Sequence, residues 1–121
     1  MRVLICGGRD FSDRELMHGL LDRLKPVIDV LIHGGAPGAD IMAAEWAIHN
    51  DIATSSFPAA WAQHGRAAGP IRNRQMLTEG KPDVVFAFPG GRGTENMVRQ
   101  ALNAHILTCH VSPPSSRSDT P

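Results

Sequence analysis

The sequence predicts a single α/β domain of the Rossmann-like type, with three layers built around a five-stranded parallel sheet. Short apolar runs alternate with segments of helical periodicity, which is typical of parallel strands joined by right-handed helical crossovers. Glycine-rich turns follow three of the apolar runs. At 121 residues the chain is long enough for one hydrophobic core and too short for two. We expect the strand order 3-2-1-4-5.

The first half of the chain is expected to contain three strands and two helices. Residues 3–6 form an apolar run that ends at a glycine pair, and Ser12 and Glu15 have the spacing of a capping box that begins a helix. Leucines at helical spacing continue this helix to Pro26, where a proline favours its end. The pattern then predicts a strand over residues 27–32, a turn over 33–40, a helix over 41–50 and a strand over 52–57.

The second half begins with a stretch rich in proline, alanine and glycine over residues 58–69, which we expect to be a loop. The pattern then predicts a helix around residues 71–79, a strand over 83–88, a helix over 93–104 and a strand over 106–111. Thr94 is expected to be the N-cap of the last helix. Residues 112–121 are mostly serine, proline and charged residues, so we expect a disordered tail after a folded domain over 1–111.

The charge and the cysteine content of the chain argue against several classes of function. Twelve basic residues are matched by twelve acidic ones, so the net charge gives no support for binding long nucleic acids. Cys6 and Cys109 lie in apolar runs and are expected to be reduced and buried. Histidine and cysteine spacing matches no zinc site, and we expect no metal and no cofactor. The chain opens with a strand rather than a signal sequence, so we expect a cytoplasmic protein without a membrane span.

Three glycine-rich loops carry the expected ligand site. In an open α/β sheet, ligands bind beyond the carboxyl ends of the strands where the strand order reverses, here at the first and fourth strands. Their loops are residues 7–10 and 89–94, and a third loop, residues 34–40, follows the second strand. Glycine allows a close backbone approach, and the amides and dipole of a following helix attract an anion. We therefore expect a phosphate site here.

The candidate ligand-binding residues come from these loops and from the helix before the fourth strand. The phosphate is expected on the amides of residues 90–94, with the first glycine pair and Arg72 nearby, and the ribose close to residues 35–40. Arg9 and Arg92, inside the glycine loops, can fold over the phosphate. The candidates are Gly7, Gly8, Arg9, Gly35, Gly38, Asp40, Arg72, Asn73, Gly90, Gly91, Arg92, Gly93 and Thr94. Asp40 also fits a simple role at the start of its helix. The spacing matches neither the dinucleotide fingerprint nor the P-loop.

Two features leave alternatives open. The 58–69 segment can lie over the ligand with Trp61 as a stacking face for a base, or Trp61 can simply pack that segment against the domain. Apolar positions such as Met42, Trp46 and Met76 fit the core and also fit a dimer face. A homodimer is therefore one of the open alternatives.

Four motifs in order resemble the SLOG superfamily, and within it the short YspA-like, cpYpsA-related proteins of bacteria and phages. They are residues 7–11, 33–40, 69–73 and 89–94. Residues 89–94 also resemble the PGGxGT motif of the Lonely Guy enzymes, and residues 34–40 resemble the glycine loop of the DNA-processing protein DprA. The SLOG resemblance implies a small-molecule ligand of the nucleotide or ADP-ribose type.

The Lonely Guy resemblance implies a different activity, hydrolysis of the N-glycosidic bond of nucleoside 5′-monophosphates. Arg72 matches the arginine of those enzymes, but Met97 stands where they carry a glutamate. Glu95, two residues earlier on the helix, points about 200° away from that position. We therefore expect a nucleotide-binding domain, and a phosphoribohydrolase with Arg72 and Glu95 as catalytic residues is the alternative.

Overall fold

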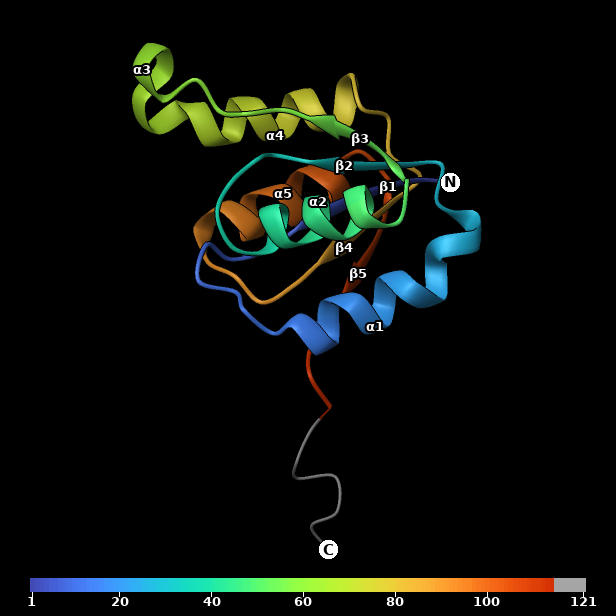
Figure 1. The fold of residues 1–121 in the computed structure, drawn as a ribbon. Coiled ribbons are helices and arrows are strands. Elements are labelled where there is room, and N and C mark those ends of the chain that lie inside the picture. The colour runs from blue at the N-terminus through green and yellow to red at the C-terminus, as the bar shows by residue number, and fades with distance from the viewer. Residues whose placement is uncertain (115–121) are drawn as a thin grey trace, which may run out of the picture.

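The computed structural model describes residues 1–114 and contains one five-stranded parallel sheet between two layers of helices (Figure 1). The strands are β1 (Arg2–Cys6), β2 (Val30–His33), β3 (Ala53–Ser56), β4 (Val84–Ala87) and β5 (Leu107–His110). They lie in the order β3-β2-β1-β4-β5, and every neighbouring pair is parallel. The predicted fold class and strand order are confirmed.

The helices divide between the two faces of the sheet. They are α1 (Arg14–Leu24), α2 (Ala39–His49), α3 (Trp61–His64), α4 (Ala68–Thr78) and α5 (Arg92–Asn103), with 3₁₀ turns at Lys25–Val27 and Gly65–Ala67. The helices α1 and α2 cover one face, and α4 and α5 cover the other. Central strand residues alternate between the two cores: Val3 packs with Met17 of α1, and Leu4 packs with Met76 of α4. Coverage of both faces explains why these strands are continuous apolar runs.

Two boundaries near the first helix differ from the sequence prediction. Asp13, not Ser12, is the N-cap of α1, because its Oδ1 accepts a hydrogen bond of 3.1 Å from the Leu16 amide. The strand expected from residue 27 begins at Val30. Pro26 lies near the start of the 3₁₀ turn Lys25–Val27. At this position a backbone N–H would have no partner within the turn, so proline costs no hydrogen bond.

Differences in the second half concern the segment before β4 and the start of α5. Residues 58–69 are not a simple loop, since they contain α3, a 3₁₀ turn and the first two residues of α4. The helix α5 begins at Arg92 with Gly91 as its N-cap, so the prediction of Thr94 as N-cap was wrong. Cys6 is buried as expected, whereas Cys109 on the edge strand β5 is only half-buried.

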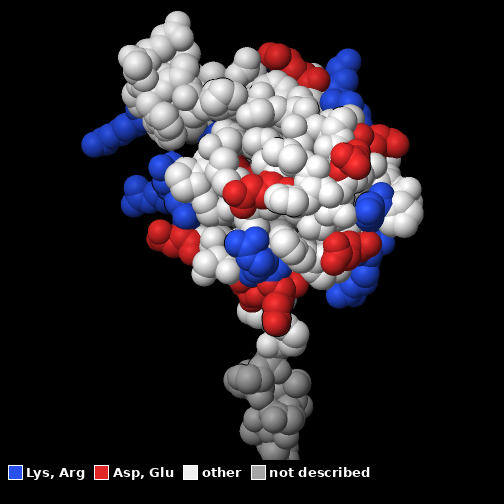
Figure 2. Space-filling view, viewed as in Figure 1, with Lys and Arg blue, Asp and Glu red and all other residues white. Residues whose placement is uncertain are grey.

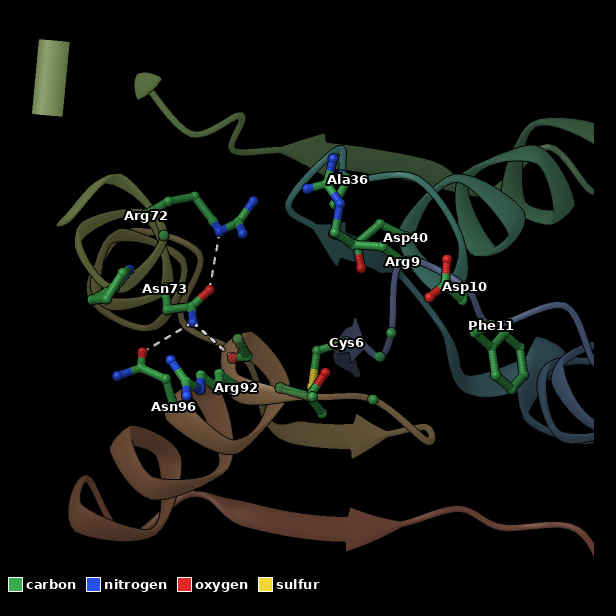
Figure 3. A pocket seen from close by; sticks show the side chains of 18 of the residues that line it. Cys6, Arg9, Asp10, Phe11, Ala36, Asp40, Arg72, Asn73, Arg92 and Asn96 are labelled. Atoms are coloured by element: carbon green, nitrogen blue, oxygen red, sulfur yellow. Dashed lines mark hydrogen bonds between the residues drawn. The ribbon is translucent and has the colours of Figure 1, made fainter. Parts of the chain in front are cut away.

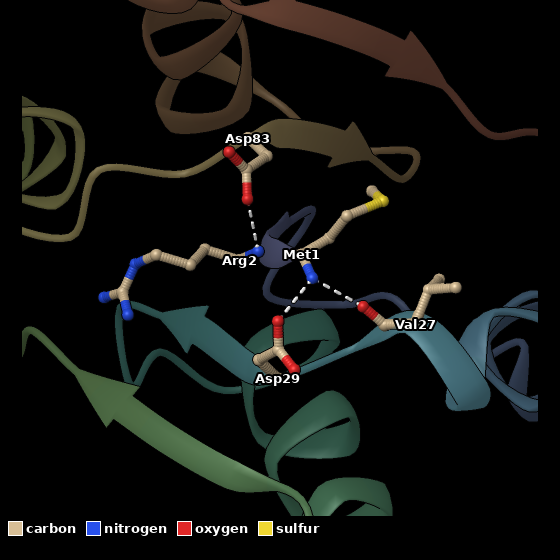
Figure 4. Close-up of polar contacts among 5 residues, drawn as sticks. All are labelled: Met1, Arg2, Val27, Asp29 and Asp83. Carbon is tan, nitrogen blue, oxygen red and sulfur yellow. Dashed lines mark hydrogen bonds and ion pairs between the residues drawn. The ribbon is translucent and has the colours of Figure 1, made fainter.

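The N-terminus is tied to the turns before β2 and β4 (Figure 4). The Met1 ammonium donates to the Val27 carbonyl at 2.6 Å and to Asp29 Oδ2 at 2.7 Å, and this contact lowers the pKa of Asp29. The Arg2 amide donates to Asp83 Oδ2 at 2.6 Å. These bonds hold the central strand at the end opposite the glycine loops, although an exposed ion pair adds little stability.

Two further expectations concern the C-terminal tail and membrane spanning. Of the expected tail, residues 112–114 have no regular secondary structure, and residues 115–121 lie outside the described residues. Among residues 1–114, no helix combines the length and the apolar character that crossing a bilayer requires.

Candidate functional site

A cleft of about 780 Å³ opens at the carboxyl ends of β1 and β4, where the strand order reverses (Figure 3). Its walls are the loop after β1, the loop after β4 with the first turn of α5, residues 36 and 40 after β2, and the inner side of α3 and α4. This is the position at which open α/β sheets bind ligands. The sequence predicted this edge of the sheet and left open whether the segment with Trp61 lies over the ligand; it did not predict that this segment forms α3.

The two central loops touch each other at a pair of glycines. The Gly8 amide donates to the Pro89 carbonyl at 2.8 Å, and a Cβ on Gly8 would lie only 3.0 Å from the Cα of Gly90. Any side chain at position 8 would push the loops apart. The Gly8 amide is therefore already bonded within the protein, so Gly8 shapes the cleft instead of offering a free donor.

The loop after β4 offers the free donors. Within the described part of the chain, the amides of residues 90–94 donate no hydrogen bond, because they precede or begin α5. A Cβ on Gly91 or Gly93 would meet nothing within 4 Å, so the loop is open at both positions. Unpaired amides and the positive end of the helix dipole make this loop suited to hold an anion.

Arg72 reaches from α4 across the cleft to the loop after β2. Its Nη1 donates to the Gly34 carbonyl at 2.7 Å. Its Nε donates to Asn73 Oδ1 at 3.0 Å, as Figure 3 shows. A Cβ on Gly34 would lie 2.7 Å from the Arg72 Cζ, so only glycine leaves room for the guanidinium. Burial lowers the pKa of Arg72, and the nearby Asp40 carboxylate opposes that shift.

Asn73 is buried and joins the two helices that border the cleft. Its Nδ2 donates to the Gly93 carbonyl at 3.2 Å and to Asn96 Oδ1 at 3.0 Å, and its Oδ1 accepts from Arg72. Asn96 Oδ1 also accepts from Gln100 Nε2 at 2.7 Å. All the polar atoms of Asn73 therefore have partners in the protein, so it positions Arg72 and the 90–94 loop. Sequence reasoning missed Asn96, which lines the cleft.

Asp40 is a buried carboxylate in the cleft. Its Oδ2 accepts hydrogen bonds from the amides of Gly34 at 3.1 Å and Ala36 at 3.2 Å, so it braces the loop that precedes α2. The N-cap of α2 is Gly38, and no side chain bonds there. Burial raises the pKa of Asp40 to about 6, against the opposing effect of its two backbone hydrogen bonds and of Arg72.

The other polar group at the base of the cleft is a thiol. Cys6 ends β1 and lines the cleft. Burial, with a smaller contribution from the Asp40 charge, raises the pKa of Cys6 to about 12. The thiol therefore stays protonated at neutral pH and is not a nucleophile, since nucleophilic attack requires the thiolate.

The cleft is positively charged although the whole chain is neutral. Its charged lining residues in the described chain are Arg9, Arg66, Arg72 and Arg92 against Asp10 and Asp40. Figure 2 shows that positively charged side chains also gather below the bulge at the α3 end of the molecule. An arginine can grip a phosphate with two parallel hydrogen bonds, so this lining favours an anionic ligand.

Three of the sequence candidates do not line the cleft. Gly35 donates its amide to His33 Nδ1 at 3.0 Å, and Gly38, with φ of +82°, packs against the backbone of the β1 loop. Glu95 is exposed and faces a separate hollow beside α5 and β5. Met97 is 1% exposed in the core, so its position in the chain does not present a side chain to the cleft.

The described residues contain no group of three or more histidine, cysteine, aspartate or glutamate side chains that could hold a metal ion. The groups that line the cleft, within residues 1–114, include backbone amides, four guanidinium groups, the Asp10 and Asp40 carboxylates and the Cys6 thiol.

We predict that Asp40 makes the stability of the fold depend on pH. Because its pKa is raised to about 6 from 3.8, the folded state holds a proton that the unfolded state loses. Its stabilising contribution is complete below pH 3.8 and is lost as the pH rises through about 6, by at most about 3 kcal/mol.

The measurement is urea unfolding of the wild type and Asp40→Asn between pH 4 and pH 7. The difference cancels the titration of other groups, including His33, whose pKa is lowered by burial. The Asn variant should gain stability relative to the wild type as the pH rises. A difference that stays constant across this range would show that the Asp40 pKa is not raised.

Comparisons with known proteins identify the family of this chain. Residues 1–64, which include β1, β2, β3 and the loops after the first two strands, match the model of the family described as "YspA, cpYpsA-related SLOG family". The chain is also 40% identical over 115 residues to the "Gene 61 protein" of Mycobacterium phage D29, and the match covers 87% of this chain and 91% of that protein. The chain therefore belongs to the YspA, cpYpsA-related SLOG family.

Proposed function

We propose that this protein binds a nucleotide or a nucleotide-derived small molecule, of the nucleoside monophosphate or ADP-ribose type, in the cleft. The observation that carries the proposal is the row of unpaired amides at residues 90–94 facing a cleft lined by four arginines. Membership in the SLOG family supports a nucleotide-related function.

The phosphate would lie on the amides of residues 90–94, with Arg72 beside it. The Arg72 Nε and Nη1 are bonded to the protein, while its Nη2 donates no hydrogen bond within the described residues. That fixed guanidinium can donate to a phosphate without losing further conformational entropy. Arg9 in the loop after β1 and Arg92 at the start of α5 are exposed and can fold over the same anion.

The ribose would lie toward Asp40. The Asp40 Oδ2 accepts hydrogen bonds from two backbone amides, and the Asp40 Oδ1 accepts no hydrogen bond within residues 1–114. Oδ1 can therefore accept a hydrogen bond from a ribose hydroxyl. The amides, the arginines and the carboxylate thus match the phosphate and sugar of one ligand.

Binding without hydrolysis is the activity that the cleft supports best. Cleaving an N-glycosidic bond builds positive charge on the ribose, which a nearby carboxylate must stabilise. Met97 provides none, because it is apolar and buried, and Glu95 faces away from the cleft. The carboxylates that line the cleft, among the described residues, are Asp10, which is exposed, and Asp40. We assign the Oδ1 of Asp40 to a ribose hydroxyl and not to the glycosidic bond, since its Oδ2 is held by the backbone.

We predict that Gly91→Asp removes nucleotide binding and leaves the protein folded. Position 91 is the N-cap of α5 with open space around it, so an aspartate fits there and its carboxylate satisfies the same amides that the phosphate needs. The affinity for AMP and for ADP-ribose, measured by calorimetry, should fall by about tenfold or more.

Gly91→Ala is the matched control, because it also adds a side chain at the open position 91 but brings neither a hydrogen-bond acceptor nor a charge. It should bind about as well as the wild type, and both variants should melt cooperatively. Unchanged affinity in folded Gly91→Asp would move the anion site away from this loop.

We also predict that the purified protein releases no free base from AMP, GMP, CMP or UMP during an hour, as followed by chromatography. The reason is that Met97 is buried in the core, Glu95 faces another hollow, and the Asp40 carboxylate braces the backbone. Base release that disappears in Arg72→Ala, but persists in the exposed α4 variant Arg74→Ala, would establish the hydrolase instead and point to Asp40 as its carboxylate.

A further inference from the structure

Trp61 is an exposed aromatic side chain on the rim of the cleft. It begins α3, lines the cleft and is 53% exposed, whereas the other tryptophan, Trp46, is 3% exposed and donates its Nε1 to Asp22 Oδ1 at 2.8 Å. Among the described large apolar side chains that are exposed, Trp61 alone lines this cleft. An indole left in water at the edge of a ligand site exposes apolar area that a flat ligand group could cover.

One edge of the indole lies close to α4. Its Cη2 lies 3.5 Å from the point that a Cβ on Gly69 would occupy, so a glycine leaves room for the ring there. Gly65, with φ of +56°, ends α3 and leads through the 3₁₀ turn into α4. The ring is 53% exposed, so much of its surface stays uncovered.

The surroundings of Trp61 differ in charge from those of the loop of residues 90–94. The lining residues at the start of α4, next to it, are Gly69 and Pro70, which carry no charge. The charged or polar lining residues of this part of the chain are Arg66 in the 3₁₀ turn and Arg72 and Asn73 further along α4. Figure 1 shows α3 at the same end of the sheet as the start of α5, and Figure 2 shows it as a mostly uncharged bulge that overhangs the domain. The cleft thus has an uncharged side at Trp61, Gly69 and Pro70 and a polar side formed by amides and arginines.

We propose that the Trp61 indole stacks on the base of the bound nucleotide and so forms the base subsite of the cleft. This inference rests on the proposed function, because it needs a ligand with a phosphate at one end. A ligand that carries an anion at one end and a flat aromatic group at the other matches both sides of the cleft. Stacking on an indole accepts any base, so Trp61 selects for the presence of a base and not for its identity.

The test compares ligands that do and do not contain a base. Calorimetry with AMP, ADP-ribose and ribose 5-phosphate is carried out on the wild type, Trp61→Ala and Trp61→Phe. The Ala variant should lose about tenfold or more in affinity for the two adenine ligands and bind ribose 5-phosphate unchanged. The Phe variant, which keeps an aromatic ring, should lose less affinity for the two adenine ligands than the Ala variant. Ile71→Ala, at an exposed α4 position outside the cleft, should change nothing.

A fluorescence titration of the wild type gives a second measurement that does not depend on the Ala variant folding. AMP should quench the Trp61 emission and ribose 5-phosphate should not, and the quenching should vanish in Trp61→Phe, where only buried Trp46 still emits.

The outcomes separate the two proposals. If Trp61→Ala weakens ribose 5-phosphate as much as AMP, or if AMP binds without any effect of Trp61, the base subsite is overturned and nucleotide binding stands. If the wild type binds none of the three ligands, the proposed function fails and the base subsite fails with it.

Discussion

The contact between the loops after β1 and β4 holds the two central loops of the cleft together. These strands are neighbours at the centre of the sheet, and their loops meet where the Gly8 amide bonds to Pro89 and the Cα of Gly90 faces Gly8. Because residues 8 and 90 are both glycines, the two backbones can approach this closely. The unpaired amides of residues 90–94 follow directly after this contact, and these residues line the cleft.

Around these amides the protein builds a rigid set of charges. Arg72 is fixed by Gly34 and by Asn73, and the same Asn73 holds the carbonyl of Gly93 at the start of α5. The buried Asn73 side chain thus positions both Arg72 and the loop of residues 90–94. Such preorganisation lowers the entropic cost of binding. A neutral protein in this way concentrates positive potential in one place.

The sequence was sufficient to predict the parts of the fold that depend on local pattern. Both faces of the sheet are covered, so β1, β2 and β4 are plain apolar runs, and glycine turns mark their carboxyl ends. The bonds that join Asn73 to Asn96 link residues 23 positions apart, and no local pattern announces them. Asp40 has the sequence position of a helix-start residue, yet its carboxylate bonds backward into the loop.

On the proposed function, the amides before and at the start of α5 bind the anionic group of the ligand. The most direct measurement is a titration of ¹⁵N-labelled protein with AMP, followed by amide chemical shifts. We expect the largest shifts at residues 90–94, and we expect them to saturate together with those of the Arg72 side chain. Saturable binding with its largest shifts elsewhere, such as the hollow beside α5 and β5, would contradict this proposal.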